Sequence, residues 1–209
     1  MDRKIGMAGS LINALTVLLF AIFLMTGFKL GYFFVCIILA LSFICMVAAL
    51  DSESKEGTKA AGRTGLVMAA IYATLIIIVY YTQCTTVANE NLTGEAQRLL
   101  DYSYMSIMFN LDILGYGIMA LSTFFIGLTV DVKTKIDKAL KVMLMLHGLF
   151  FPGCLIMPMT GMFIRNDGSS SSGGGGVLAL EFWCAFFLPI GILAFMHFKN
   201  KHIKTPADL

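Results

Sequence analysis

The chain has 209 residues, of which 58% are hydrophobic and only 13% are charged. Soluble chains carry about 25% charged residues, so this one has too few to cover a water-facing surface. The composition excludes most classes of soluble enzyme and predicts an integral membrane protein. The 15 basic residues nearly balance the 13 acidic ones, and we expect no nucleic-acid partner.

Six segments are apolar over the length of about 20 residues that a helix needs to cross a bilayer. They are residues 5–27, 30–50, 64–87, 104–130, 142–164 and 177–198. The first follows a basic start, but its apolar run is longer than the roughly 7–15 residues of a signal peptide, so we expect it to be retained. The sequence therefore predicts an all-α integral membrane protein in which residues 1–209 form a single domain of six transmembrane helices.

Several features interrupt these segments or separate them. Asn110 and Asp112 leave the outer end of the fourth segment open, and Pro152, Pro158 and Pro189 predict kinks in the fifth and sixth. The connection 88–103 is long enough for a short helix at the membrane surface. The connection 165–176 is rich in serine and glycine, which is typical of a flexible tether.

The basic residues are distributed unevenly between the two sides. With six spans, the N-terminus, the 51–63 and 131–141 loops and the C-terminal tail share one side, which then holds 12 of the 15 basic residues. Cytoplasmic loops carry such an excess of lysine and arginine. We therefore expect an N-in, C-in bundle in the cell membrane, with lipid as its main partner and any partner subunit at the cytoplasmic face.

Two helices carry small residues at steps of four. These are Gly6, Ser10 and Ala14 in the first span and Gly65, Ala69 and Ala73 in the third. Small residues let helix backbones approach closely within a membrane, where apolar burial alone does not drive association. We expect these two faces to pack closely, either against each other or each against another helix.

Few ionisable groups lie inside the spans, and each is a candidate for function because burying it is costly. Our hypothesis places Asp112, Tyr116 and Glu181 around a polar cavity in the outer half, with Asn110 in support. Burial would make the charged form of Asp112 costly, so this residue would either carry a proton or meet a cationic ligand. Asn110 and Asp112 lie about 200° apart on a helix, which argues against a shared narrow pocket. The alternative is that Asp112 and Glu181 are hydrated near the interface.

Cysteine and histidine give weaker signals. The five cysteines lie within spans without a Cys-x-x-Cys motif, which argues against a disulfide framework and leaves one redox pair among Cys36, Cys84 and Cys184 open. His147 and His197 are expected near the inner surface, where they would approach each other. No carboxylate cluster is expected beside them, so we predict no metal and no cofactor.

Motifs for known enzyme classes are missing from the sequence. It contains no His-Glu-x-x-His, no Gly-x-Ser-x-Gly and no phosphate-binding loop, which favours a protein that is not an enzyme. We therefore expect binding or transport of a small molecule through the outer-half polar site. The alternatives are a membrane-embedded enzyme using Asp112 and Glu181 as acid and base, and a non-catalytic scaffold or sensor. In size and topology the expected bundle is similar to the substrate-binding membrane subunits of vitamin uptake transporters.

Overall fold

The computed structural model describes residues 1–103, 106–161 and 174–200, with side chains in the last segment from residue 178 onward. These residues form helices and turns and contain no strand, so the all-α prediction is confirmed for the described part of the chain. Within that part, six helical segments are long and apolar enough to cross a membrane. The fold is therefore compatible with a multi-pass membrane protein.

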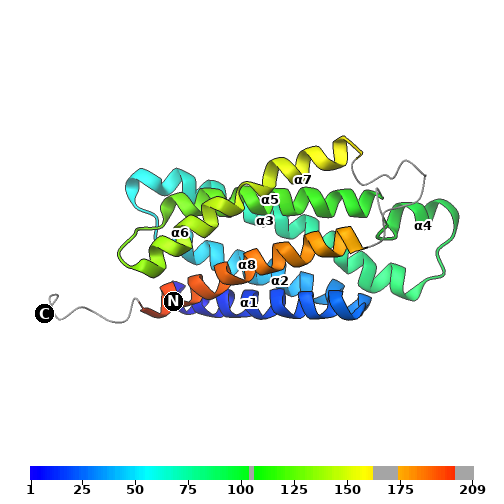
Figure 1. Ribbon diagram of the computed structural model, residues 1–209, viewed down its shortest axis with the longest axis horizontal. Helices are drawn as coiled ribbons and strands as arrows, with labels where there is room; N and C mark the ends of the chain where they lie inside the picture. The colour runs from blue at the N-terminus through cyan, green and yellow to red at the C-terminus, as the bar shows by residue number, and fades with distance from the viewer. Residues whose placement is uncertain (104–105, 162–173, 201–209) are drawn as a thin grey trace, which may run out of the picture.

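The helices lie side by side along one axis (Figure 1). They are α1 (Asp2–Thr26), α2 (Lys29–Asp51), a 3-10 turn η1 (Glu56–Thr58), α3 (Lys59–Thr82), a π-helical turn η2 (Gln83–Val87), α4 (Gly94–Leu100), α5 (Ile107–Thr129), α6 (Lys135–His147), α7 (Phe150–Met159) and α8 (Gly174–Asn200). Helix α1 packs on α2 and α8, α3 packs on α2 and α5, and α5 also contacts α6 and α7. The bundle closes where α6 meets α8.

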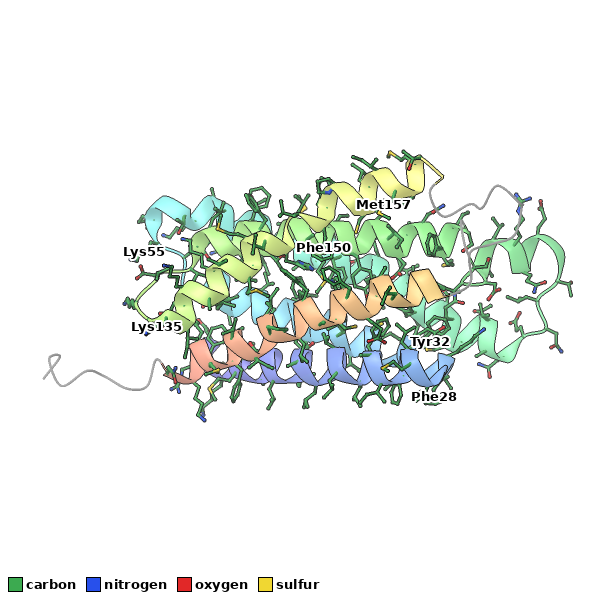
Figure 2. All side chains as sticks on the ribbon, viewed as in Figure 1. Phe28, Tyr32, Lys55, Lys135, Phe150 and Met157 are labelled. Carbon is green, nitrogen blue, oxygen red and sulfur yellow. The ribbon has the colours of Figure 1, made fainter. Side chains whose placement is uncertain are left out.

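One end of the bundle holds the basic segments, and we call it the basic end. It comprises residues 1–4, 51–63, 131–141 and 199–200, and Figures 1 and 2 show Met1, Lys55 and Lys135 there, with Phe28 at the opposite end. Arg3 joins the first helix to the last, because its Nε donates to the carbonyl oxygen of Phe198 at 2.7 Å and its Nη2 to that of Lys199 at 3.1 Å. An arginine is favourable at this position, since the last carbonyl groups of a helix lack partners within the helix.

The fifth predicted span is wrong in its start, whereas the interruption that its prolines predicted is present. The helix begins at Lys135 rather than at residue 142, because Thr134 and Asp137 form a capping box at its N-terminus. It stops after His147, and α7 begins at Phe150. Pro152 supplies the reason, since its ring would clash with the carbonyl group of Gly148 in a continuous helix. Most of the expected 131–141 loop is therefore helical.

The connections at the opposite end agree in part with expectation. A short helix, α4, is present in the 88–103 connection as predicted. Residues 174–176 of the expected tether belong to α8 instead, while residues 165–173 lie outside the described part of the chain. Helix α3 extends the third span to Lys59 at the basic end.

The two faces of small residues pack against other helices, which is one of the two predicted arrangements. A Cβ atom at Gly6 would lie 2.7 Å from the ring of Phe198 and 2.8 Å from Cβ of Ala49, so α1 approaches α8 and α2 closely. A Cβ atom at Gly65 would lie 2.6 Å from Cγ1 of Ile126. The glycine there lets α3 approach α5, and Ser122 of α5 donates a hydrogen bond to the carbonyl oxygen of Gly65 at 2.7 Å.

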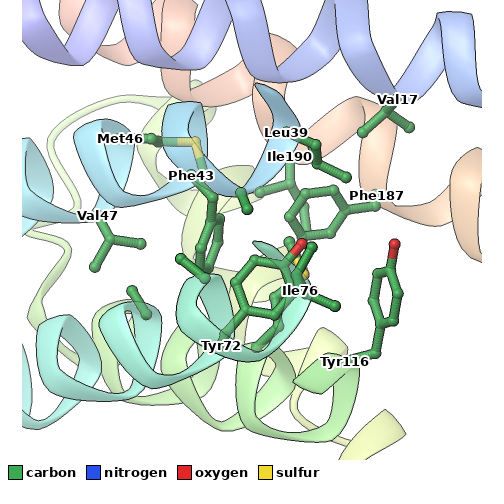
Figure 3. Close-up of a cluster of buried hydrophobic side chains, with 14 of the residues drawn as sticks. Val17, Leu39, Phe43, Met46, Val47, Tyr72, Ile76, Tyr116, Phe187 and Ile190 are labelled. Carbon is green, nitrogen blue, oxygen red and sulfur yellow. The ribbon is translucent and has the colours of Figure 1, made fainter. Parts of the chain in front are cut away.

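The interior between these helices is filled with apolar and aromatic side chains (Figure 3). Phe43 of α2 packs edge-on against Tyr72 of α3, with ring centroids 5.3 Å apart, and also contacts Phe187 of α8 at 6.1 Å. All three side chains are fully buried. This apolar core lies next to the buried polar residue Asp112, which is described below.

Candidate functional site

Asp112 is buried inside the bundle, near the end opposite to the basic end. Helix α5 begins at Ile107 after Ser106, whose Oγ accepts a hydrogen bond from the backbone N–H of Phe109 at 3.1 Å. This start places Asp112 about 8 Å along the helix axis from its first residue. Its side chain is only 1% exposed. It therefore lies in the protein interior and not in a hydrated position at the interface.

The carboxylate of Asp112 is only half satisfied. The hydroxyl of Tyr102 donates to Oδ2 at 2.7 Å, whereas Oδ1 has no hydrogen-bond partner among the described residues. Among the described residues, the lysine, arginine and histidine side chains that form ion pairs do so with carboxylates other than that of Asp112. A carboxylate buried without a cation costs several kcal/mol, so this position requires either a proton or a positively charged partner.

Aromatic rings surround Asp112. On the side of Asp112 that faces away from the basic end, the ring of Tyr102 is stacked on that of Tyr80, with centroids 6.1 Å apart. The Tyr102 ring also packs edge-on against Phe33 at 5.7 Å and Phe109 at 5.9 Å. Four different segments, α2, α3, α5 and the connection before α5, thus contribute a ring to this group. The rings exclude water and leave the hydroxyl groups as the main polar neighbours of the carboxylate.

A second aromatic group lies one turn deeper. Tyr116 packs on Trp183 of α8 at 4.9 Å and on Tyr72 at 5.9 Å, and its hydroxyl lies 3.9 Å from Sγ of Cys36. Figure 3 shows the rings of Tyr72 and Tyr116 projecting from neighbouring helices into the interior. The Tyr72 hydroxyl is buried without a hydrogen-bond partner in the described chain. Tyr116 follows Asp112 by one turn of α5 and packs on Tyr72, so the three belong to one cluster.

The other two candidates lie elsewhere. Asn110 is exposed on the outer surface of α5, as expected from its angular separation from Asp112. Glu181 is partly buried in a groove of about 160 Å³ between α1 and α8. The rest of that groove is formed by Val17, Leu18, Ala21, Cys184, Ala185 and Leu188. The structure thus brings Asp112 and Tyr116 together and leaves Glu181 and Asn110 outside their cluster.

The expected approach of two histidines is wrong. His147 lies at the end of α6, more than three turns from its start, because this helix begins earlier than predicted. Trp183 Nε1 donates to His147 Nε2 at 3.1 Å, so the ring proton must lie on Nδ1, which donates to Thr123 Oγ1 at 2.8 Å. His197 instead contacts Asp137 and Glu53 at the basic end.

The described residues offer no ready metal or redox centre. No group of three or more histidine, cysteine or carboxylate side chains in this part of the chain is arranged to hold a metal ion. All five cysteines are free, so the pair considered among Cys36, Cys84 and Cys184 is not formed. The chemistry available at the cluster is that of one carboxylate, several phenol hydroxyls and aromatic faces.

Three residues of the cluster were missed in the sequence. Tyr102 lies in the connection 88–103, where no helical periodicity indicates which side chains face inward, and Gln83 is a polar residue within the predicted span 64–87. Trp183 is the only tryptophan of the chain, and its buried N–H group required a partner, which was a usable signal. Comparisons with protein-family models, with curated proteins and with solved structures found no match for this chain.

Proposed function

We propose that the chain is a multi-pass protein of the cell membrane with both termini in the cytoplasm. The support is the excess of lysine and arginine at the basic end, which holds 12 of the 15 basic residues when residues 201–209 are assigned to that side. Asp112 then lies in the outer half of the bilayer, on the side from which solutes arrive.

Cysteine labelling tests this orientation. In a chain whose five native cysteines are replaced by alanine, we expect the Thr93→Cys variant to react with a membrane-impermeant maleimide in intact cells. The Ser52→Cys variant should react only after the cells are permeabilised, because Ser52 lies at the basic end. Both positions are exposed, so equal labelling of the two in intact cells would contradict the orientation.

We further propose that the protein binds a small molecule through an ammonium group, as one step of its transport or sensing. The observation that carries this proposal is the buried Asp112 carboxylate, which has one oxygen without a partner among the described residues. Ionisable groups inside membrane proteins commonly serve as counter-ions for ligands or as proton carriers. An ammonium group would neutralise the carboxylate, and one that carries N–H groups, such as that of benzylamine, would also donate to its open oxygen.

The aromatic surroundings favour an organic cation. A cation within about 6 Å of a ring face gains roughly 0.5–2 kcal/mol, with tryptophan and tyrosine the best partners. Tyr80, Tyr102, Tyr116 and Trp183 supply such rings around the carboxylate. Apolar rings also suit the hydrocarbon part of an amine, whereas a hydrated metal ion would need more oxygen ligands.

The enzyme hypothesis receives less support from the geometry. A general acid and a general base must reach the same substrate. Asp112 faces the buried cluster, whereas Glu181 lines the groove between α1 and α8, so the two are not arranged as a catalytic pair. A scaffold function, or a partner subunit at the basic end, would leave the buried Asp112 without a role.

Thermal unfolding of the purified protein in detergent tests the proposal with matched pairs of compounds. The probes are choline against its neutral isostere dimethylbutanol, and benzylamine against benzyl alcohol. A ligand at about 100 times its dissociation constant stabilises the folded state by about 2.7 kcal/mol, or roughly 5–10 °C for a domain of this size. We expect a shift of this order for at least one cation and none for its neutral partner.

Two variants make the test specific. Asp112→Asn should abolish the shift, and the unliganded variant should melt at the wild-type temperature or above, because the amide removes a buried charge and still accepts from Tyr102. Glu181→Gln, in the separate groove, should retain the shift. A cation response that survives Asp112→Asn, or no response to any of the cations, would contradict the proposal.

A further inference from the structure

Gln83 occupies an unusual place at the end of α3. The helix changes there to a π-helical turn, Gln83–Val87. Such turns are rare in proteins, and those that occur are often found at functional sites. The side chain of Gln83 is 2% exposed, although it lies in a segment apolar enough to face lipid. A buried amide needs partners for both its N–H₂ group and its oxygen.

Both partners of Gln83 lie where α4 ends, Leu100 being its last residue and Tyr102 the second residue after it. Its Nε2 donates to the carbonyl oxygen of Leu100 at 2.8 Å, and its Oε1 accepts from the backbone N–H of Tyr102 at 3.0 Å. One side chain therefore fixes two backbone groups that are two residues apart. Residues 101–103, which follow α4, have no helix or strand of their own to fix them.

The contacts of Tyr102 carry this constraint to Asp112. With its backbone held by Gln83, the ring of Tyr102 inserts between Phe33, Tyr80 and Phe109, and its hydroxyl donates to Asp112 Oδ2 at 2.7 Å. The hydrogen bond from Tyr102 to Asp112 thus depends on a glutamine that does not touch Asp112.

We infer that Gln83 is the positioning residue of the Asp112 site, and that the segment it holds, Leu100–Ser103, is the cover that closes this site on the outer side. A ligand or a proton reaching Asp112 from that side must first displace Tyr102. The cover belongs to the proposed binding function, but its contacts are independent of any ligand. A purely structural Gln83 would affect the stability of the fold without controlling access to the interior.

Cys36 provides a probe of access. Its thiol is fully buried beside Tyr116, below the cover. In a chain whose other four cysteines are replaced by alanine, the rate of its reaction with a charged, membrane-impermeant methanethiosulfonate reports opening of the cover. We expect Gln83→Met, which keeps the side-chain length and removes both hydrogen bonds, to raise this rate by roughly ten- to a hundredfold in sealed cells.

The matched control is Thr82→Met, whose native hydroxyl donates only to Ile78 of its own helix. This variant should react at the wild-type rate. If Gln83→Met is folded by circular dichroism and reacts no faster than the control, the inference is overturned.

A second variant covers the case in which Gln83→Met does not fold. Tyr102→Ala removes the ring that covers Asp112 and leaves Gln83 and its backbone contacts in place. Cys36 should therefore react at least about tenfold faster in this variant as well. If the folded Tyr102→Ala variant shows an unchanged rate of Cys36 reaction, the inference that Leu100–Ser103 covers the site is equally overturned. Because no ligand is added, the result does not depend on whether choline or benzylamine binds.

Discussion

Replacing Gly9 by valine should separate α1 from α2 and destabilise the fold by about 3 kcal/mol, at the upper end of the usual cost of overpacking. A Cβ atom at Gly9 would lie 2.8 Å from the backbone nitrogen of Met46 and 3.0 Å from the carbonyl oxygen of Ser42. Both are backbone atoms of α2, so no change of rotamer relieves the overlap. Unfolding in mixed detergent micelles, followed by circular dichroism, measures the loss.

The matched control is Ala8→Val, one residue earlier on the same helix. Ala8 is exposed on the surface of the bundle, so the added methyl groups meet no neighbouring helix. The control should unfold within about 0.5 kcal/mol of the wild type. Equal stability of the Gly9 and Ala8 variants would show that α1 and α2 do not approach as closely as described.

The same interface also contains polar groups that a wider spacing would disrupt. Asn13 is fully buried, and its Nδ2 donates to Ser42 Oγ at 3.5 Å, a long hydrogen bond. Its Oδ1 has no partner within the described chain. Moving α1 outward would leave the N–H₂ group of Asn13 unsatisfied as well as its oxygen, at a cost of about 1–3 kcal/mol in an apolar surrounding.

The number and approximate limits of the helices could be predicted because a membrane span requires a long apolar run, which is a local property of the sequence. The small residues likewise predicted close packing. Their partners could not be predicted, since Gly6 meets Phe198 at the far end of the chain. The start of α6 was missed although its capping box, Thr134 with Asp137, is visible in the sequence. The charged residues of 131–141 favour a loop by composition, but those from Lys135 onward occupy the first two turns of α6.

The candidate site could be predicted only in part, for a related reason. Asp112 and Tyr116 are four residues apart, so helical geometry alone puts them on one face. Tyr102 reaches the same place from an irregular connection, in which no periodicity specifies direction, and the contact of Gln83 with its backbone depends on the path of that connection. Glu181 was grouped with Asp112 by depth in the membrane, but depth does not fix which way a side chain points around its helix.

His197 shows how long-range contacts organise the basic end. Its Nδ1 lies 2.6 Å from Asp137 Oδ1 and its Nε2 lies 2.9 Å from Glu53 Oε2. Ionised carboxylates only accept hydrogen bonds, so both ring nitrogens donate and the imidazole is positively charged. One side chain of α8 thus bridges the start of α6 and the connection after α2, and it separates two carboxylates that would otherwise repel each other.

Replacing His197 by alanine is expected to destabilise the fold by about 3 kcal/mol, at the lower end of the cost of breaking a buried ion pair, because Glu53 retains 25% exposure of its side chain. The variant removes the imidazole that contacts both Asp137 and Glu53. Thermal and detergent unfolding measure the loss, and Lys199→Ala, an exposed cation two residues further on, should change stability by less than about 0.5 kcal/mol.

A double variant identifies the cause of the loss. If repulsion between the carboxylates contributes, His197→Ala combined with Glu53→Gln should recover about 1 kcal/mol relative to His197→Ala alone, because the amide removes one of the two charges. Simple loss of ring packing predicts no recovery. Because His197 joins α8 to two separate segments of the basic end, its removal should also loosen both of them together. Their amide hydrogens should then exchange faster in parallel, whereas those near Asp112 should keep the wild-type rates.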